Sequence, residues 1–496
     1  MPARFVVACT NGHLDDFPWI SFVHRGQTCA SARLRLIEFS PTGEARALEV
    51  RCDSCGAARR MSEAFGDAAK LAMPTCRGRR PHLRDFAEEG CDCKVATMLL
   101  GSTNLWFPEV FTTLAIPTAT TQLDRLVEAH WANLQRVQTI QNIELLRQFG
   151  QLGDFLGYSD AELWQALERR RAQDAGNDQK ENPADLKTPE WAILSQPATV
   201  GLWPDSSEDL RLRRVAVPDE FDPFLAKVVL VERLREVRAL VGFTRIDAPG
   251  DLDNDPNQAS GKRTDLARRQ PTWVPATEVR GEGIFIQFNE AALQAWLHRC
   301  AATSFAAQFE QAHRNWRRVR GILPEEAHYP DLRYVLLHSF AHALMRQVTL
   351  ECGYTAASVR ERIYSCAPNE TPEQPEPMAG VLIYTATPDS EGTLGGLVNL
   401  GEPEQLGRLV RLALRDAQRC ASDPLCAEHP PSHDGITLHA AACHACLFAP
   451  ETSCERGNRY LDRAMLTPTV EQETLHFFDP VISLPYQYGL AALPQV

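Results

Sequence analysis

DLRYVLLHSFAHALMRQ, residues 331–347, is apolar around most of the circumference of a helix. A helix that is hydrophobic on all sides must be surrounded by protein. We therefore expect an interior helix here, around which the C-terminal part of the chain is built.

The segments around this helix predict a mixed α/β (α+β) arrangement. GIFIQF (283–288) and GVLIYTAT (380–387) are short, apolar and rich in β-forming residues, so two buried strands are expected. Amphipathic helices are expected from about Glu290 to His313 and from Glu402 to about Arg419. The second strand is followed by GTLGGL, which gives the order strand, glycine turn, helix.

Outside this helix, the sequence patterns predict several domains. The first hundred residues suggest short strands and turns, and Leu123 begins a helical stretch with apolar residues at three- and four-residue steps. Ser159 and Glu162 have the spacing of a capping box, and residues 226–246 predict a helix or a strand and helix. The expected domains are an N-terminal module (1–117), a helical segment (118–175), a middle α/β region (190–330) and a C-terminal α/β domain (331–496).

Composition restricts the class of protein. The 496 residues suggest about three or four domains, and 44% hydrophobic and 23% charged residues are typical of a soluble globular chain. No apolar run approaches the roughly 18 to 20 residues that span a bilayer, and the start does not resemble a signal peptide, so we expect a cytoplasmic protein without membrane insertion. The net charge of -13 argues against a surface covered with phosphate-binding groups, although local basic runs remain.

The cysteines predict zinc. Fifteen cysteines in a reducing compartment are better explained as metal ligands and buried thiols than as disulfides. They concentrate in two clusters, one near each end of the chain, and each cluster contains a C-x-x-C pair. Four thiolates saturate a zinc ion and leave no position for substrate, so two structural zinc ions are expected, the second closing the C-terminal domain with four cysteines.

The N-terminal cluster allows alternatives. The predicted ligands are Cys52, Cys55, Cys76 and Cys91, and Cys93 can replace Cys91 because a C-x-C pair offers either sulfur. A further set could hold a second N-terminal metal or serve as spare ligands for the first; its members are Cys9, His13, His24 and Cys29. A buried thiol and a turn-capping imidazole would give the same pattern.

His338 and His342 lie four residues apart on the interior helix, a spacing that can direct two imidazoles to one metal. No glutamate lies between them, so the base of an H-E-x-x-H protease is missing. The alternative is a pair of hydrogen-bonded core histidines, which could contact the loop at Gly395 and Gly396. This glycine loop could accept a phosphate or be a tight turn; it is not a Walker A loop, because no Gly-Lys-Ser/Thr follows.

Several runs between residues 331 and 466 then resemble a known family. They are HSFAHALMRQ, SVRERIYS, GVLIYTATPDSEGTLGGLVNLG, DPLCAEH and ACHACLFAPETSCERGNRYLDRAML. They resemble a domain of formerly unknown function that is found at the C-termini of several helicases and on separate helicase partners. Upstream, CTNGHLDDFPW, CDSCG, TNLWFPEVFTTLAIP, REVRALVGFTRI and GEGIFIQF resemble the DrmB family of the bacterial DISARM anti-phage system.

The resemblance implies a non-catalytic defence subunit that binds DNA and a separately encoded helicase of the SF2 type, and that supports the loading or ATPase activity of that motor. It places the C-terminal zinc ligands in a matching motif, at Cys426, Cys443, Cys446 and Cys454. Cys420 is a fifth thiol whose role stays open. No enzymatic activity is implied.

Two functional hypotheses follow. In the first, the protein contacts DNA that is single-stranded or has a single-stranded end. Its candidate contacts are an arginine-rich run around a tryptophan, Arg314, Trp316, Arg317 and Arg318, where a base could stack; a packing helix with a solvated side is the alternative. In the second, the protein is a phosphodiesterase or nuclease that uses His338 or His342 near the Gly395 loop, although that stretch lacks a nearby Lys and Asp.

Overall fold

The computed structural model describes residues 4–27, 29–41, 44–116, 122–174, 186–197, 199–203, 206–246, 263–269, 271–301, 303–368, 377–387, 396–431 and 435–478. These residues form two units. Unit 1 comprises residues 1–112 and 238–277, and unit 2 comprises residues 113–237 and 278–496. The chain thus leaves unit 1, forms part of unit 2 and returns, so unit 1 is discontinuous in sequence.

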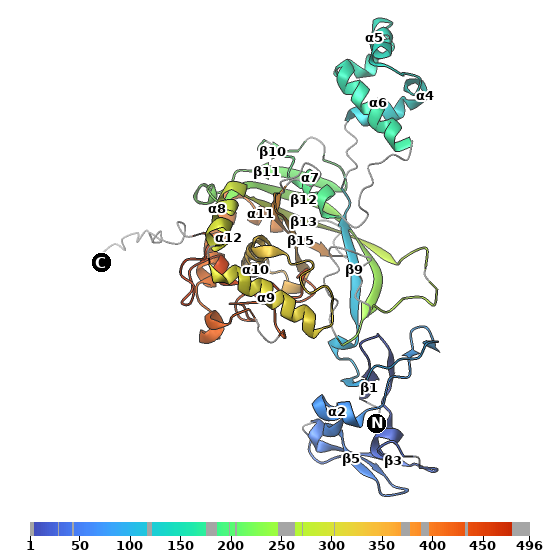
Figure 1. Ribbon diagram of the computed structural model, residues 1–496. Helices are drawn as coiled ribbons and strands as arrows, with labels where there is room; N and C mark the ends of the chain where they lie inside the picture. The colour runs from blue at the N-terminus through green and yellow to red at the C-terminus, as the bar shows by residue number, and fades with distance from the viewer. Residues whose placement is uncertain are drawn as a thin grey trace, which may run out of the picture. The chain divides into compact units, whose positions relative to one another are not determined.

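A sheet organises unit 2, and the described residues give it seven strands (Figure 1). The order is β10-β11-β12-β13-β15-β14, and β9 also pairs with β12. The strands are β9 (Phe107–Leu114), β10 (Gly201–Leu202), β11 (Leu210–Val215), β12 (Leu225–Thr244), β13 (Ala276–Phe288), β14 (Val359–Cys366) and β15 (Met378–Thr387). The β13–β15 and β14–β15 pairs are antiparallel, with Phe285 opposite Leu382 and Ile363 opposite Val381. Together with the helices, this sheet confirms the mixed α/β class.

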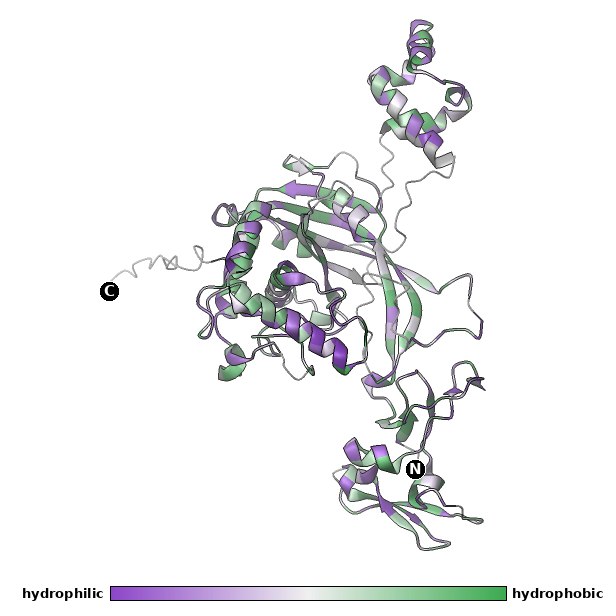
Figure 2. Cartoon of the chain, viewed as in Figure 1, coloured by the Kyte–Doolittle hydropathy of each residue, from purple (hydrophilic) through white to green (hydrophobic). Residues whose placement is uncertain are grey.

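Alternation along the strands divides the buried residues between two faces. Ile284 and Ile286 of β13 belong to one hydrophobic cluster, whereas Phe285 between them belongs to another. Successive side chains of a strand point to opposite faces, so these clusters cover the two sides of the sheet. In Figure 2 the covering helices, such as α9 and α12, alternate between hydrophilic and hydrophobic residues.

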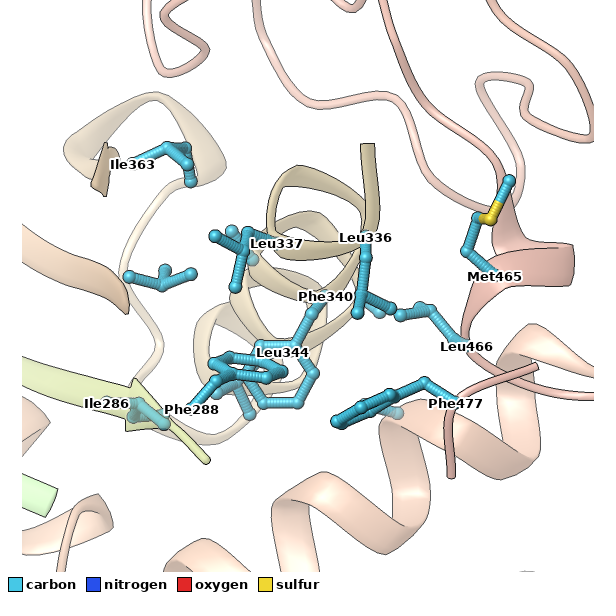
Figure 3. Close-up of a cluster of buried hydrophobic side chains, with 14 of the residues drawn as sticks. Ile286, Phe288, Leu336, Leu337, Phe340, Leu344, Ile363, Met465, Leu466 and Phe477 are labelled. Carbon is cyan, nitrogen blue, oxygen red and sulfur yellow. The ribbon is translucent and has the colours of Figure 1, made fainter. Parts of the chain in front are cut away.

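The larger cluster packs five helices, which are α8 (Glu290–Ala301), α9 (Ser304–Val319), α10 (Asp331–Cys352), α11 (Gly396–Leu400) and α12 (Pro403–Ala417). Helix α10 is buried along almost its whole length, which confirms the interior helix predicted from residues 331–347. Figure 3 shows its side chains Leu336, Phe340 and Leu344 near Phe288 of β13 and Phe477 from the end of the described chain. Aromatic rings pack tightly there, with the centroids of Phe288 and Phe340 5.2 Å apart.

The other face of the sheet is covered by α7 (Lys187–Leu194), whose Trp191 packs edge-on against Phe285. Glu190 of the same helix is 1% exposed and accepts hydrogen bonds from the Arg362 guanidinium (2.8 Å) and the Tyr364 hydroxyl (2.9 Å). The Leu114 N–H also donates to Glu190, at 2.9 Å. This buried carboxylate therefore joins α7, β9 and β14.

A helical segment with its own small core comprises α3 (Gln122–Ala129), α4 (Trp131–Leu134), α5 (Ile140–Gln148) and α6 (Asp160–Asp174). The predicted capping box begins α6: the Ser159 N–H donates to the Glu162 carboxylate at 2.7 Å, and the Glu162 N–H donates to the Ser159 hydroxyl at 3.3 Å. This exchange satisfies two backbone donors that a helix start otherwise leaves without partners.

Unit 1 consists of short elements, as its sequence predicts. They are β1 (Phe5–Ala8), β2 (Leu14–Asp16), α1 (Trp19–Val23), β3 (Leu34–Glu38), β4 (Leu48–Cys52), β5 (Ala58–Arg60), α2 (Gly66–Ala72), β6 (Arg79–Arg80), β7 (Asp85–Phe86) and β8 (Ala96–Leu99). They form the sheets β2-β1-β8 and β3-β4-β5 and the pair β6-β7.

Two predictions of secondary structure are wrong. Residues 225–244 form the single strand β12, because Val228–Leu234 pair with β11 and the strand also pairs with β13 and β9. The helix expected from Glu290 to His313 is two helices, because Thr303 is extended and its side chain accepts the Phe305 N–H, which starts α9. The strands at 283–288 and 380–387 and the helix near 402–419 are confirmed. The loop at Gly392–Gly395 lies outside the described residues. Within the described part of the chain, no helix is long and apolar enough to cross a membrane.

Candidate metal centres

Within the described residues, four groups of His, Cys or Glu side chains bring ligand atoms within 4.8 Å of one another. One consists only of cysteines: Cys420, Cys426, Cys443 and Cys446. Its sulfur–sulfur distances are 3.5 Å (Cys420–Cys443), 3.7 Å (Cys426–Cys446) and 3.6 Å (Cys443–Cys446). A tetrahedral ion with Zn–S bonds of about 2.3 Å has ligand–ligand edges of about 3.8 Å. The four thiols therefore have the spacing of a closed zinc site.

Local turns present these thiols. Cys426 lies in the 3-10 turn Pro424–Glu428, where the Asp423 carboxylate accepts the Leu425 N–H at 3.0 Å. The Cys446 N–H donates to the Cys443 carbonyl at 3.1 Å, which closes the C-x-x-C turn. Burial raises the pKa of the Cys426 thiol to about 11. A bound cation would offset this cost, because metals bind the thiolate.

A different group lies in the interior of the C-terminal domain. It consists of His338 and His342 of α10, Glu361 of β14 and Cys454. All four side chains are buried. His338 Nε2 lies 2.9 Å from Glu361 Oε1 and 3.1 Å from Cys454 Sγ, and His342 Nε2 lies 3.3 Å from the same carboxylate oxygen. Both imidazoles thus face a carboxylate and a sulfur atom inside the core.

The N-terminal module holds two more groups. One is built around the C-x-x-C of residues 52–55 and adds His24 and Cys29. The Gly56 N–H donates to the Cys52 carbonyl at 2.9 Å, and Gly56 has a φ of 78°, a conformation that glycine adopts without strain. His24 is oriented by the Ile20 carbonyl, 2.8 Å from its Nδ1, and its Nε2 lies 3.2 Å from Cys55 Sγ.

The other N-terminal group consists of Cys9, His13, Cys76 and Cys91. Cys9 Sγ lies 3.4 Å from His13 Nδ1 and 3.9 Å from Cys91 Sγ. The turn between Cys9 and His13 needs Gly12, because φ there is 79° and an added Cβ would lie 1.4 Å from Thr264 Oγ1. Burial raises the pKa of Cys9 well above its usual value.

The grouping differs from the one expected from sequence. The four predicted N-terminal ligands do not come together: Cys52 and Cys55 belong to one group, and Cys76 and Cys91 to the other. The second set, which includes His24 and Cys29, supplies the missing members. Cys93 is in neither group, although its sulfur lies 4.0 Å from the Thr10 hydroxyl.

At the C-terminal end, Cys426, Cys443 and Cys446 come together as expected, but their fourth member is Cys420. Cys454 lies instead beside His338, because the chain after Phe448 turns back onto α10 and β14. Glu361 was not among the residues predicted to bind metal. A signal was available: Val359 and Ile363 of the same strand are core residues, and alternation places Glu361 on their face.

The proposed DNA contacts are largely engaged within the protein. Trp316 is 6% exposed and lies between the Arg320 and Arg459 guanidinium groups, at 4.2 and 4.7 Å from its ring centroid. It is therefore not available for a base to stack on, and that expectation is corrected. Arg317 is buried and donates to the Pro324 carbonyl at 3.1 Å.

The remaining two candidates, Arg314 and Arg318, are paired with Glu310 (2.5 Å) and Glu325 (2.7 Å). Their role in DNA binding stays a prediction.

A basic cleft of about 460 Å³ lies beside the four-cysteine group. Cys446 lines it, together with three exposed arginines, Arg346, Arg415 and Arg419. Asp416 is the acidic residue of the lining, and it accepts a hydrogen bond from Gln347 at 2.9 Å. The local charge is thus positive despite the acidic chain.

Two family matches coincide with the cysteine-rich ends. Residues 1–107 match a domain of unknown function, DUF8724, and residues 340–447 match the MrfA Zn-binding domain. The second match contains the whole four-cysteine group but neither His338 nor Cys454.

A curated relative covers nearly the whole chain. The DISARM protein DrmB of Bacillus paralicheniformis is 32% identical over 487 residues, which is 96% of this chain and 82% of that protein. A crystal structure of the DUF1998 helicase MrfA bound to DNA overlaps with a TM-score of 0.20 and 11% identity, over 47% of this chain and 23% of that chain. An overlap that small carries no argument about fold or function.

Proposed function

This chain belongs to the DrmB family of the DISARM defence system, and we propose that it acts there as a non-catalytic subunit. The subunit would bind DNA and a separately encoded SF2-type helicase, and it would support the loading or ATPase activity of that helicase. The observation that carries the proposal is the similarity to a DrmB protein along 96% of the chain. The match to a zinc-binding domain named after the helicase MrfA supports the association with a motor.

Zinc would have a structural role in this subunit. The four-cysteine group and the two N-terminal groups each offer at least three thiolates and four ligands in all, which saturates a tetrahedral ion. We therefore propose three saturated sites here, where sequence spacing suggested two. Ligands of this kind need reduced thiols, which favours a cytoplasmic location.

The basic cleft beside the four-cysteine group is the DNA contact that we favour. Arg346 and Arg419 are exposed and project into one concave surface, whereas Arg314 and Arg318 are held by carboxylates. A phosphate backbone, single-stranded or at a single-stranded end, would be held there by charge, so affinity should fall steeply with salt.

The first test measures ATP hydrolysis by the partner helicase with and without this protein, on single-stranded and duplex DNA. Stimulation or a changed DNA requirement is expected. Unchanged hydrolysis, together with failure of the two proteins to co-purify, would overturn the proposal.

A second test locates the DNA contact. Arg346→Glu with Arg419→Glu should weaken DNA binding at least tenfold and flatten its dependence on salt. Arg314→Glu with Arg318→Glu is the matched control, with the same change of charge on α9, and should retain most of the affinity. The opposite ranking would move the contact to α9.

A nuclease is the alternative function, with His338 or His342 acting on a phosphate. Both imidazoles are buried and directed at Glu361, which speaks against their reaching a phosphate. Cleavage activity of the purified protein that is lost in the His338→Ala, His342→Ala double variant would establish it.

A further inference from the structure

The group of His338, His342, Glu361 and Cys454 differs from the three thiol-rich groups. It offers two imidazoles, one carboxylate and one thiol, and all of these side chains are less than 10% exposed. We propose that it is a separate metal site that binds one divalent transition-metal ion, zinc by its ligand chemistry, and ties helix α10 to β14 and to the loop that carries Cys454.

The orientation of the imidazoles is the first argument. His342 Nδ1 lies 2.7 Å from the Leu447 carbonyl, and His338 Nδ1 lies 3.3 Å from the Tyr460 carbonyl. A carbonyl oxygen only accepts hydrogen bonds, so each Nδ1 carries the proton and donates. In a neutral imidazole the Nε2 then carries a free lone pair. Histidines that bind metals are oriented by the same kind of bond from the second nitrogen to a carbonyl.

The inner side of the group consists of acceptors. Both Nε2 atoms face Glu361 Oε1, and the His338 Nε2 also faces Cys454 Sγ. Glu361 Oε1 and Cys454 Sγ already receive backbone N–H groups: Glu455 donates to the carboxylate at 3.2 Å, and Asn458 donates to the sulfur at 3.2 Å. Lone pairs that converge in a dry interior need a positive charge between them.

Charge and spacing favour one divalent ion over two protonated histidines. A thiolate and a carboxylate together carry two negative charges, which one divalent ion neutralises at a single point. Two imidazolium ions would instead place two further charges in a dry core, at a desolvation cost of several kcal/mol per ion. The ligand pairs are 2.9, 3.1 and 3.3 Å apart, which is up to about 0.5 Å shorter than the tetrahedral edges of about 3.3 to 3.6 Å expected for zinc with N, O and S ligands, so the side chains would open slightly around the ion.

A buried oxygen without a partner gives an independent indication. Glu361 Oε2 makes no hydrogen bond in the described structure, although its carboxylate is fully buried. Such a group costs stability unless something compensates for it. A carboxylate that binds a metal through one or both oxygens accounts for this atom.

A buried histidine elsewhere in the same domain shows what a purely structural imidazole looks like. His313 is 0% exposed, its Nδ1 lies 2.7 Å from the Tyr460 hydroxyl, and its Nε2 lies 2.9 Å from the Ala327 carbonyl. Both nitrogens there meet oxygens that satisfy one proton and one lone pair, so no cation is needed. His338 and His342 lack that balance.

The experiment measures the zinc content of the purified full chain by elemental mass spectrometry. Glu361→Gln and Cys454→Ser should each contain one zinc ion per chain fewer than the wild type, and the control His313→Gln should contain the wild-type amount. Equal zinc content in the wild type and in both site variants would overturn the proposal.

Because a site variant can fail to fold, the wild type is also tested directly after exchange of zinc for ¹¹³Cd. A ligand set with one sulfur gives a resonance far upfield of sites with three or four sulfurs, so one such resonance is expected beside those of the thiol-rich groups. A spectrum with thiolate-rich resonances alone would contradict the site without relying on any substitution.

Discussion

The N-terminal module and the C-terminal domain are stabilised in different ways. The module is built from strands of two to five residues around two small hydrophobic clusters, and two ligand groups lie among them. The C-terminal domain has a 22-residue helix buried against long strands, and its ligand groups lie beside a core that is already extensive. Bound metal would therefore substitute for part of a core in the module, whereas in the C-terminal domain it would add local ties to an existing core.

The largest expected effect follows from removing a ligand in the module. Cys52→Ser with Cys55→Ser should unfold residues 4–99, because structural zinc contributes about 10 to 16 kcal/mol, as much as a small domain has in total. Hydrogen exchange read by mass spectrometry would show lost protection there and retained protection in α10.

Cys93→Ser is the matched control, a cysteine of the same module outside both ligand groups. It should leave exchange unchanged. If it unfolds the module as well, Cys93 is a ligand and the grouping needs revision; if neither variant unfolds it, the comparison between the two regions fails.

In unit 2 the largest effect should come from a buried pair instead, which ties α7 to β14 of the C-terminal domain. Glu190→Ala leaves the buried Arg362 without its carboxylate, at a cost of about 3 to 5 kcal/mol in the free energy of unfolding. Urea denaturation would measure it. Glu190→Gln, which keeps the shape of the side chain and an acceptor for Tyr364, should cost less. An equal loss would show that the missing charge alone is responsible.

A pH dependence distinguishes unit 1. Burial raises the pKa of Glu109 from 4.5 to about 7, although Arg263 at 3.8 Å opposes the shift. The folded state therefore holds this proton more tightly than the unfolded state. The resulting stability is complete below about pH 4.5 and is lost as the pH rises through 7.

Glu109→Gln should accordingly be neutral near pH 4 and stabilise unit 1 by up to about 3 kcal/mol at pH 8. Thermal unfolding of the wild type and the variant at both pH values would measure the difference. A gain of the same size at pH 4 would show that the effect does not come from titration of the carboxyl group.

The smallest effect is expected on the outer side of α9. Arg318→Ala removes an exposed ion pair with Glu325 and should change stability by less than about 1 kcal/mol. Arg317→Ala, at a buried neighbour, should cost more because packing and the bond to Pro324 are lost. Equal effects in thermal unfolding would mean that α9 is not the packing helix that its burial indicates.

Much of the fold could be predicted from local pattern. Residues 331–347 are apolar on all sides, and only an interior helix satisfies that pattern, as α10 shows. The apolar and basic alternation at 226–246 predicted a helix or a strand and helix, whereas the structure has one strand there. This segment is a strand because it pairs with β11, and no local feature of the sequence predicts that pairing.

The metal-ligand groups could likewise be predicted only in part, where their members are close in sequence. The C-x-x-C pairs at 52–55 and 443–446 were evident, since both sulfurs come from one turn. Their partners were not, and Cys454 shows why: it meets His338 across 116 residues of sequence. Alternation with Val359 and Ile363 places Glu361 on the buried face, but a single buried carboxylate does not by itself indicate which distant side chains it meets.

The sequence alone determined the interior helix, the main strands, the supply of thiols and imidazoles, and the family to which the chain belongs. These are properties of local periodicity, composition and similarity along the chain. Which ligands share a site, and the packing of Trp316 against Arg320 and Arg459, follow only from the tertiary structure. Such contacts join residues far apart in sequence, and their geometry is set by how helices and strands pack, which no spacing along the chain encodes.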